Sequence, residues 1–231
     1  MDEHLLTDCA RNMWAFPLVG AFLGLLAGLF GWAAIHFLPG IVVGAMVLAL
    51  LLWMTGLHHT DGLLDFGDGV MAHGTPEHKI DVMHDQLTGA GALALGIMTI
   101  LIAALSFGQL GLGNIVWAVI VVELCAKLSM VVVARVGRPV RQGMNSAFLA
   151  KMHGMDGNLR LTVALVISFT LGLVFLKFAG IIVVLASVLT ALAMVAVAHK
   201  HFKGVTGDIF GATNELSRMV CAIVVVAVVL W

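Results

Sequence analysis

Long apolar runs alternate with three polar segments along this chain. The apolar runs cover residues 16–37, 41–57, 89–107, 114–136, 161–177, 181–198 and 219–231. They are continuous rather than alternating, and most approach the roughly 20 residues that a helix needs to cross the hydrocarbon core. The pattern predicts an all-α, polytopic integral membrane bundle of about seven transmembrane helices, in a single membrane domain covering residues 1–231.

The polar segments, residues 58–88, 137–160 and 199–218, each follow an even-numbered span and are the expected catalytic loops. Ten of the twelve Lys and Arg residues lie in these segments, at their edges or near the N-terminus: Arg11, Lys79, Arg135, Arg138, Arg141, Lys151, Arg160, Lys200, Lys203 and Arg218. Cytoplasmic loops carry an excess of positive charge. We therefore expect the N-terminus and the three segments to face the cytoplasm, from a plasma membrane or a cell inner membrane.

The composition excludes several classes of protein. Hydrophobic residues make up 61% and charged residues 11% of the chain, against about 45–50% and about 25% in soluble domains. A disordered chain and an ordinary soluble enzyme are excluded. The net charge of −1 provides no basic field for nucleic acid. Three widely separated cysteines form no disulfide framework and are interpreted as buried apolar residues: Cys9, Cys125 and Cys221.

Five aspartates, out of thirteen acidic residues in the chain, fall within one stretch of the first polar segment: Asp61, Asp65, Asp68, Asp81 and Asp85. The first three share one face if the second helix continues past residue 57, and the last two share a face at the start of the third span. Crowded carboxylates repel one another beside a low-dielectric region, and a divalent cation would compensate. Oxygen ligands favour Mg²⁺ or Mn²⁺.

Three other interpretations of these acids remain. They could form a solvated cytoplasmic face. Five nearby histidines could form a zinc hydrolase site: His58, His59, His73, His78 and His84. The sequence has no H-E-x-x-H motif, however, which is typical of such sites. A transporter could use the acids as an ion path, but such groups usually lie near the midplane of the membrane, whereas these lie at one face.

The string from His59 to Gly69 resembles the H-x-D-G-L-x-D-x-x-D-G signature of the cobalamin-5′-phosphate synthases, also called adenosylcobinamide-GDP ribazoletransferases. Later blocks match in the same order: Lys79-Ile80-Asp81-Val82-Met83-His84-Asp85, Arg138-Pro139-Val140-Arg141 and Gly204-Val205-Thr206-Gly207-Asp208. The resemblance implies a transferase of cobalamin biosynthesis. Its substrates would be adenosylcobinamide-GDP and α-ribazole or α-ribazole 5′-phosphate, and its products GMP and adenosylcobalamin or its 5′-phosphate.

A wider similarity to CDP-alcohol phosphotransferases rests on Asp65-x-x-Asp68-Gly69-x-x-Ala72 followed by Asp81-x-x-x-Asp85. His73 stands where that family has Arg, and no Gly precedes Asp81 at the expected place. This similarity implies a metal site for phosphoryl transfer. It also leaves a phospholipid headgroup phosphotransferase as the alternative function.

The resemblance also implies residue roles. The metal, Mg²⁺ or Mn²⁺, would be held by Asp61, Asp65, Asp68, Asp81 and Asp85, with Asp85 or Asp61 as the catalytic base. The substrate would be bound by His59, Arg138, Arg141, Lys203, Thr206 and Asp208. Two interpretations of the arginines remain open. Their guanidinium groups could each bind phosphate oxygens with two hydrogen bonds, or they could only mark the cytoplasmic ends of membrane helices.

Charged residues also occur within a span. Glu123 and Lys127 are four residues apart and are expected to form a structural ion pair. The expected partners of the chain are its substrates and the lipid bilayer, without nucleic acid. The sequence leaves open whether the chain forms a homo-oligomer.

Overall fold

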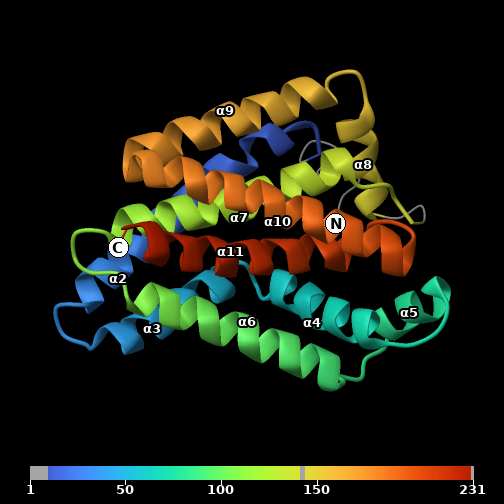
Figure 1. The fold of residues 1–231 in the computed structure, drawn as a ribbon, viewed down its shortest axis with the longest axis horizontal. Coiled ribbons are helices and arrows are strands. Elements are labelled where there is room, and N and C mark those ends of the chain that lie inside the picture. The colour runs from blue at the N-terminus through green and yellow to red at the C-terminus, as the bar shows by residue number, and fades with distance from the viewer. Residues whose placement is uncertain (1–9, 141–143, 230–231) are drawn as a thin grey trace.

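The regular structure is helical in the part of the chain described here, residues 10–140 and 144–229 of a computed structural model. The helices are η1 (Met13–Ala15), α2 (Phe16–Ala34), α3 (Gly40–Met54), α4 (His58–Met71), α5 (Pro76–Met83), α6 (Ala90–Gly108), α7 (Ile115–Val136), α8 (Met144–His153), α9 (Gly157–Leu176), α10 (Phe178–Phe202) and α11 (Gly207–Val229). They form an elongated bundle with most axes along its length (Figure 1). The all-α prediction is confirmed.

Within residues 10–140 and 144–229, six helices are long and apolar enough to cross a membrane: η1 with α2, then α6, α7, α9, α10 and α11. The pair α3 and α4 passes the same test together but is bent by 96° between the two helices, which gives up to seven spans. The structure therefore agrees with a polytopic helical membrane protein.

Helix α7 lies at the centre of the bundle. Its apolar window is 83% buried, the highest value among the candidate spans of the described chain. Three glycines on one face of α2 allow it to approach α7 closely: Gly20, Gly24 and Gly28. A Cβ atom on Gly20 or Gly24 would lie 2.3 or 2.6 Å from a backbone oxygen of α7. Small residues at such spacing are how membrane helices pack backbone to backbone.

The second predicted span is interrupted. Helix α3 ends at Met54, Gly56 and Leu57 both have a φ of 63°, and α4 begins in a new direction at His58. The Thr55 hydroxyl donates to the carbonyls of Leu51 and Leu52, at 3.1 Å each, and so satisfies acceptors at the end of α3. The second helix therefore does not continue past residue 57, because the left-handed backbone ends it.

The last predicted span begins much earlier than expected, at Gly207 rather than at residue 219. Its first half is rich in polar residues that are nevertheless buried: Thr213, Asn214, Glu215, Ser217 and Arg218. Their low hydropathy hides this half from a search for apolar runs. The polar segments of residues 137–160 and 199–218 are likewise largely helical rather than loops, because they contain α8 and the first turns of α9 and α11.

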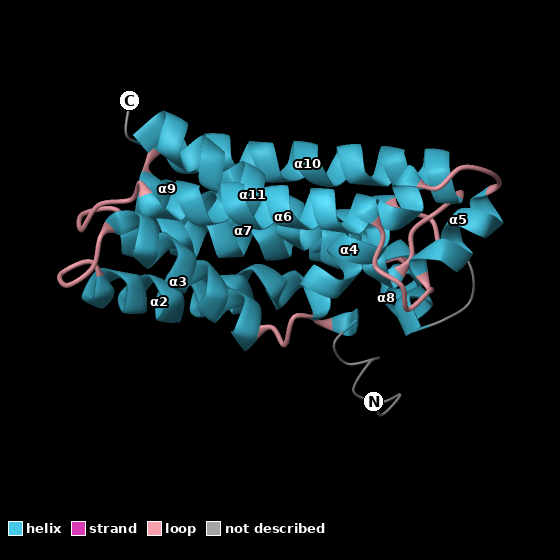
Figure 2. Cartoon of the chain, turned by 90° about the horizontal axis from the view of Figure 1, so that it is seen from below, coloured by secondary structure: helices cyan, strands magenta, loops and turns pink. Residues whose placement is uncertain are grey.

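The polar segments gather at one end of the bundle. Helices α5 and α8 and the turn between α10 and α11 lie at the right in Figure 1, whereas the connections α2–α3, α6–α7 and α9–α10 lie at the left. Figure 2 shows the same separation from below. We call the end with α5 and α8 the polar end. The position of the three polar segments at one end of the bundle agrees with the sequence-based prediction that they share one side of the membrane.

Candidate active site

Helix α4 carries three acids on one side and glycines on the others. Asp61, Asp65 and Asp68 are spaced by one or two helical turns, so the predicted shared face is confirmed. A Cβ atom on Gly62 would lie 2.8 Å from the backbone oxygen of Asp208 in α11. One on Gly67 would lie 2.8 Å from a backbone oxygen of α6. The glycines thus allow α4 to pack closely between α11 and α6.

These acids line a cavity of about 360 Å³, which we call the acidic pocket. It is lined by Asp61, Leu64, Asp65 and Asp68 of α4, by Met83 at the end of α5, by His84, Asp85, Gln86, Leu87 and Thr88 in the turn that follows, and by Ala92 of α6. Four of the five predicted metal ligands therefore line one cavity: Asp61, Asp65, Asp68 and Asp85. Carboxylates from two separate segments of the chain meet there.

Asp68 also holds the start of α6 in place. One of its carboxylate oxygens accepts the N–H of Gly89 at 2.7 Å, and the other accepts the N–H of Ala92 at 2.8 Å. A carboxylate at this position satisfies backbone donors that a helix leaves unpaired and favours the positive end of the helix dipole. Asp68 therefore joins the wall of the acidic pocket to the packing of α6.

Asp81 and Asp85 do not share a helical face, so this expectation was wrong. Helix α5 ends at Met83, and the chain turns at His84 before it reaches Asp85. Asp85 lines the acidic pocket and accepts the N–H of Leu87 at 3.3 Å, whereas Asp81 is exposed on α5 and does not line the pocket. The two acids therefore belong to different local structures, Asp81 to helix α5 and Asp85 to the turn that follows it.

A second acidic segment approaches from α11. Asp208 accepts the hydroxyl of Thr206 at 3.2 Å and lies 3.8 Å from Nε2 of His84. Asp65 lies close enough to Asp61 and Asp208 for both charges to act on it. Thr206 and Asp208, predicted as substrate ligands, therefore lie beside the acidic pocket. His84, which the sequence analysis named only in the zinc alternative and not among the substrate or magnesium ligands, lines it. The adjacent Asp85 was the signal that could have indicated it.

The second and third polar segments meet at the polar end. The N–H of Val205 donates to the carbonyl of Arg138 at 2.7 Å, and the N–H of Arg138 donates to Nε2 of His199 at 3.1 Å. A Cβ atom on Gly204 would lie 2.6 Å from the Arg138 carbonyl oxygen, so the glycine permits this contact. Arg138 and Lys203 are both exposed and do not line the acidic pocket. Arg141 lies outside the described residues.

His59 occupies a different place from the acids. It packs against α11, where a Cβ atom on Gly211 would lie 2.9 Å from the His59 carbonyl oxygen, and it does not line the acidic pocket. Two buried side-chain atoms in the described chain have no hydrogen-bond partner, Nδ1 of His59 and Oγ1 of Thr60. Buried polar atoms normally have a partner, so both are candidates for contact with substrate or ordered water.

The chemistry of the donors indicates which metal the acidic pocket could hold. Within residues 10–140 and 144–229, no three Asp, Glu, His or Cys side chains are already gathered as a metal-binding group. Uncompensated carboxylates repel one another and so stay apart. Four carboxylates around one cavity nevertheless fit an oxygen-preferring ion such as Mg²⁺ or Mn²⁺. Of the described histidines, His84 alone lines the pocket, which gives the zinc interpretation no set of ligands.

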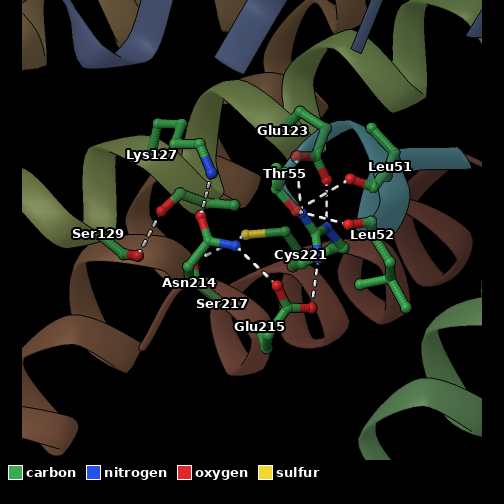
Figure 3. A network of polar contacts seen from close by, with 12 residues as sticks. Leu51, Leu52, Thr55, Glu123, Lys127, Ser129, Asn214, Glu215, Ser217 and Cys221 are labelled. Carbon is green, nitrogen blue, oxygen red and sulfur yellow. Dashed lines mark hydrogen bonds and ion pairs between the residues drawn. The ribbon is translucent and has the colours of Figure 1, made fainter. Parts of the chain in front are cut away.

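A buried polar network joins α7 to α11 (Figure 3). Arg218 forms ion pairs with Glu123 of α7 and Glu215 of α11, and all three side chains are buried. Lys127 donates to Oδ1 of Asn214 at 2.7 Å, and Asn214 donates to Glu215 at 3.0 Å. The expected Glu123–Lys127 pair was therefore wrong, because the partners of both residues lie on α11. We call these five residues the buried network.

Comparison with known proteins identifies the family. A sequence profile described as cobalamin-5-phosphate synthase matches residues 1–226. Adenosylcobinamide-GDP ribazoletransferase of Methanosarcina mazei is 32% identical over 247 residues, covering 97% of this chain and 85% of that protein. The protein of the same name from Thermococcus kodakarensis is 34% identical over 228 residues, covering 96% and 91%. No solved structure matches this chain. The chain therefore belongs to the cobalamin-5-phosphate synthase family.

Proposed function

We propose that this chain joins adenosylcobinamide-GDP to α-ribazole or α-ribazole 5′-phosphate. A ribose hydroxyl oxygen of the acceptor forms a bond to the phosphorus on the cobinamide side. The bond from that phosphorus to the GMP oxygen breaks, and the hydroxyl proton passes to a carboxylate. The products are GMP and adenosylcobalamin or its 5′-phosphate. Family membership supports the class of reaction, since the relatives are named for this transfer.

The observation that carries the proposal is the gathering of Asp61, Asp65, Asp68 and Asp85 around one cavity. Transfer of a phosphoryl group builds negative charge on the oxygens of a pyrophosphate. A bound Mg²⁺ or Mn²⁺ would offset that charge and the charge of the carboxylates. Asp61, Asp65 and Asp85 would hold it, and Asp68 would contribute while it caps α6. Asp81 is left out of this set because it is exposed outside the pocket.

The base that accepts the hydroxyl proton is proposed to be Asp85, with Asp61 as the other candidate. Both line the acidic pocket, and a carboxylate within hydrogen-bond reach of the attacking hydroxyl can take its proton. Asp208 would orient this region through its contacts with Thr206 and His84.

Binding of the phosphates is proposed for residues at the rim of the polar end. Arg138 and Lys203 come from two segments that pair through Val205, so their backbones are held side by side. Guanidinium and ammonium groups suit phosphate oxygens. Arg141 is retained as a candidate from the sequence, and His59 through its unpartnered Nδ1. The polar end, with its Lys and Arg residues, is proposed to face the cytoplasm from the plasma membrane.

A phospholipid headgroup phosphotransferase remains the second candidate, because one observation favours it. An apolar groove of about 700 Å³ lies between α4, α6 and α10 and is lined by residues such as Phe66, Val70, Leu95 and Met194. By helical spacing, Phe66 and Val70 project from the side of α4 opposite to Asp65 and Asp68. Such a groove could take an acyl chain, but it does not open onto the same face of α4 as the acids.

One assay separates the two functions. The purified chain is incubated with Mg²⁺, adenosylcobinamide-GDP and α-ribazole or its 5′-phosphate, and GMP and corrinoid products are measured together. We expect equal amounts of GMP and product, and no GMP without an acceptor. A parallel reaction supplies a CDP-activated head-group alcohol with diacylglycerol as its acceptor, and measures CMP. Release of CMP without release of GMP would overturn the proposed reaction in favour of the second candidate.

A further inference from the structure

The acidic pocket is not lined by acids and other polar residues alone. Four of its eleven lining residues are apolar, and we call them the apolar lining: Leu64, Met83, Leu87 and Ala92. The proposed reaction uses the carboxylates of the pocket and gives these four residues no task. A cavity that bound only a metal ion and phosphates would have no use for apolar side chains, because both ligands prefer oxygen and nitrogen partners.

Two residues of the apolar lining are held in place over glycines. A Cβ atom on Gly96 of α6 would lie 2.5 Å from Cδ2 of Leu64, and one on Gly69 of α4 would lie 2.9 Å from Sδ of Met83. Any larger residue at these glycines would therefore displace the two side chains. Packing thus fixes Leu64 and Met83 before a ligand arrives, which lowers the entropy that binding costs.

The other two residues are tied to carboxylates of the same cavity. The N–H of Leu87 donates to Asp85 at 3.3 Å, and the N–H of Ala92 donates to Asp68 at 2.8 Å. The Leu87 side chain is 77% exposed, so most of its apolar surface is uncovered in the absence of a ligand. A ligand that covers this surface would therefore lie beside the carboxylates that are proposed to react.

The size of the cavity limits which part of the substrates can reach the apolar lining. In the proposed reaction, on which this step rests, the acceptor brings its ribose hydroxyl to Asp85 or Asp61, and its base is one sugar away. The guanine of the donor is farther off, because the leaving phosphate and a second ribose lie between. A volume of about 360 Å³ suits a small heterocycle with its sugar, whereas a corrin ring is too large for it.

The chemistry of the acceptor base matches these side chains. The base of α-ribazole is a dimethylbenzimidazole, a flat bicyclic ring with two methyl groups and, once joined to ribose, no N–H donor. Leucine and alanine offer apolar surface to such a ring, and the sulfur of Met83 makes favourable contacts with aromatic rings. Guanine carries an amino group, an N–H and a carbonyl, whose hydrogen bonds an apolar surface cannot satisfy.

We propose that the apolar lining binds the base of the acceptor nucleoside and selects a methylated, apolar bicyclic ring over polar bases. The acidic pocket then serves both partners of the reaction: its carboxylates act on the phosphates and the hydroxyl, and Leu64, Met83, Leu87 and Ala92 hold the ring that sets the position of that hydroxyl.

The test measures binding without turnover. α-Ribazole and the corresponding riboside of unsubstituted benzimidazole are titrated separately into the purified chain with Mg²⁺ by calorimetry, in the absence of adenosylcobinamide-GDP. We expect α-ribazole to bind about tenfold more tightly, because two methyl groups leave water. Leu87→Ser should weaken α-ribazole binding about fivefold and reduce this preference, since it removes apolar surface from the cavity.

Two variants control for effects on folding and on general surface polarity. Leu87→Met keeps an apolar side chain and should retain the preference for α-ribazole. Met71→Ser changes another exposed apolar residue, 67% exposed and outside the acidic pocket, and should leave both affinities unchanged. During turnover, Leu87→Ser should raise the KM for the acceptor and leave the KM for adenosylcobinamide-GDP unchanged.

The possible results separate this inference from the proposed reaction. Equal binding of the two ribosides, binding of neither, or unchanged α-ribazole binding in Leu87→Ser would overturn the inference. Displacement of α-ribazole by GMP would assign the apolar lining to guanine and would overturn it as well. A preference for α-ribazole that depends on Leu87, in a chain that releases no GMP from the donor, would support the inference and refute the proposed reaction.

Discussion

Asp65 and Asp68 stand one turn apart on α4, yet they differ in what they hold. Asp68 accepts two backbone N–H groups at the start of α6. Asp65 is partly buried and near three other carboxylates, Asp208, Asp61 and Asp68, so its charge is opposed by its surroundings. Removing the charge of Asp68 therefore takes away the cap of helix α6, whereas removing the charge of Asp65 relieves repulsion between carboxylates. The same chemical change should have opposite effects on stability at these two positions.

We expect Asp65→Asn to lower GMP release by at least about 100-fold while the melting temperature stays equal or rises. Asp68→Ala should also lose activity, but its free energy of unfolding should fall by about 1–2 kcal/mol because the cap of α6 is lost. Initial rates and thermal unfolding in the same detergent measure both effects.

Asp81→Asn serves as the matched control, because Asp81 lies in the same acidic stretch but is exposed outside the pocket. It should keep most of the turnover and the same melting temperature. If Asp81→Asn were as inactive as Asp65→Asn, the ligand set proposed from the structure would be refuted in favour of the one implied by the sequence motif.

The donors around the acidic pocket also predict which metal supports turnover. GMP release should require Mg²⁺ or Mn²⁺, should stop in excess EDTA, and should survive a zinc-selective chelator, because carboxylates outnumber histidines in the lining. Binding of Mn²⁺ measured by electron paramagnetic resonance should weaken in Asp65→Asn. Tight stoichiometric zinc in the active protein would contradict this assignment.

At the scale of elements, the buried network fixes the position of α11 against α7. It contains two carboxylates and two cations: Glu123, Glu215, Lys127 and Arg218. Because α11 also packs against Gly62 of α4, this register places Asp208 beside the acidic pocket. A change in the charge balance of the network should therefore affect the stability of the bundle first and the geometry of the pocket as a consequence.

Charge balance predicts a double-mutant cycle. Glu215→Gln and Lys127→Met should each destabilise the chain by about 3–5 kcal/mol, because each leaves an uncompensated buried charge. The double variant restores neutrality and should unfold at a higher temperature than either single variant. Thermal unfolding in one detergent measures the cycle. Additive losses in the double variant would show that the pairs act independently of net charge.

For the whole molecule, the gathering of polar segments at one end predicts a single orientation. With the three native cysteines replaced, His78→Cys and Met155→Cys at the polar end should resist an impermeant maleimide in intact cells and react after the membrane is opened. Leu112→Cys, between α6 and α7, should react from outside. All three positions are exposed, so access is set by the membrane. The reverse labelling pattern would refute the cytoplasmic placement of the acidic pocket.

Local periodicity accounts for what the sequence could predict. The shared face of Asp61, Asp65 and Asp68 depends on neighbouring residues of one helix, and the polar end depends on where charges fall between apolar runs. Contacts between distant residues could not be predicted in this way. Glu123 pairs with Arg218 across the bundle, and Asp208 lies beside the acidic pocket because α11 packs closely against Gly62 of α4. The early start of α11 was missed because its buried polar residues look like a loop.

The break after α3 has a consequence for the membrane itself. Helix α3 has 15 residues, which is about 22 Å at about 1.5 Å per residue, less than the hydrocarbon thickness of about 30 Å. The polar helix α4 therefore begins below the general surface of the bilayer. A bilayer adapts to a short apolar segment by thinning around it, so we expect lipid head groups to dip beside α4. Through this depression a large hydrophilic corrinoid could reach the acids from water without entering the hydrocarbon.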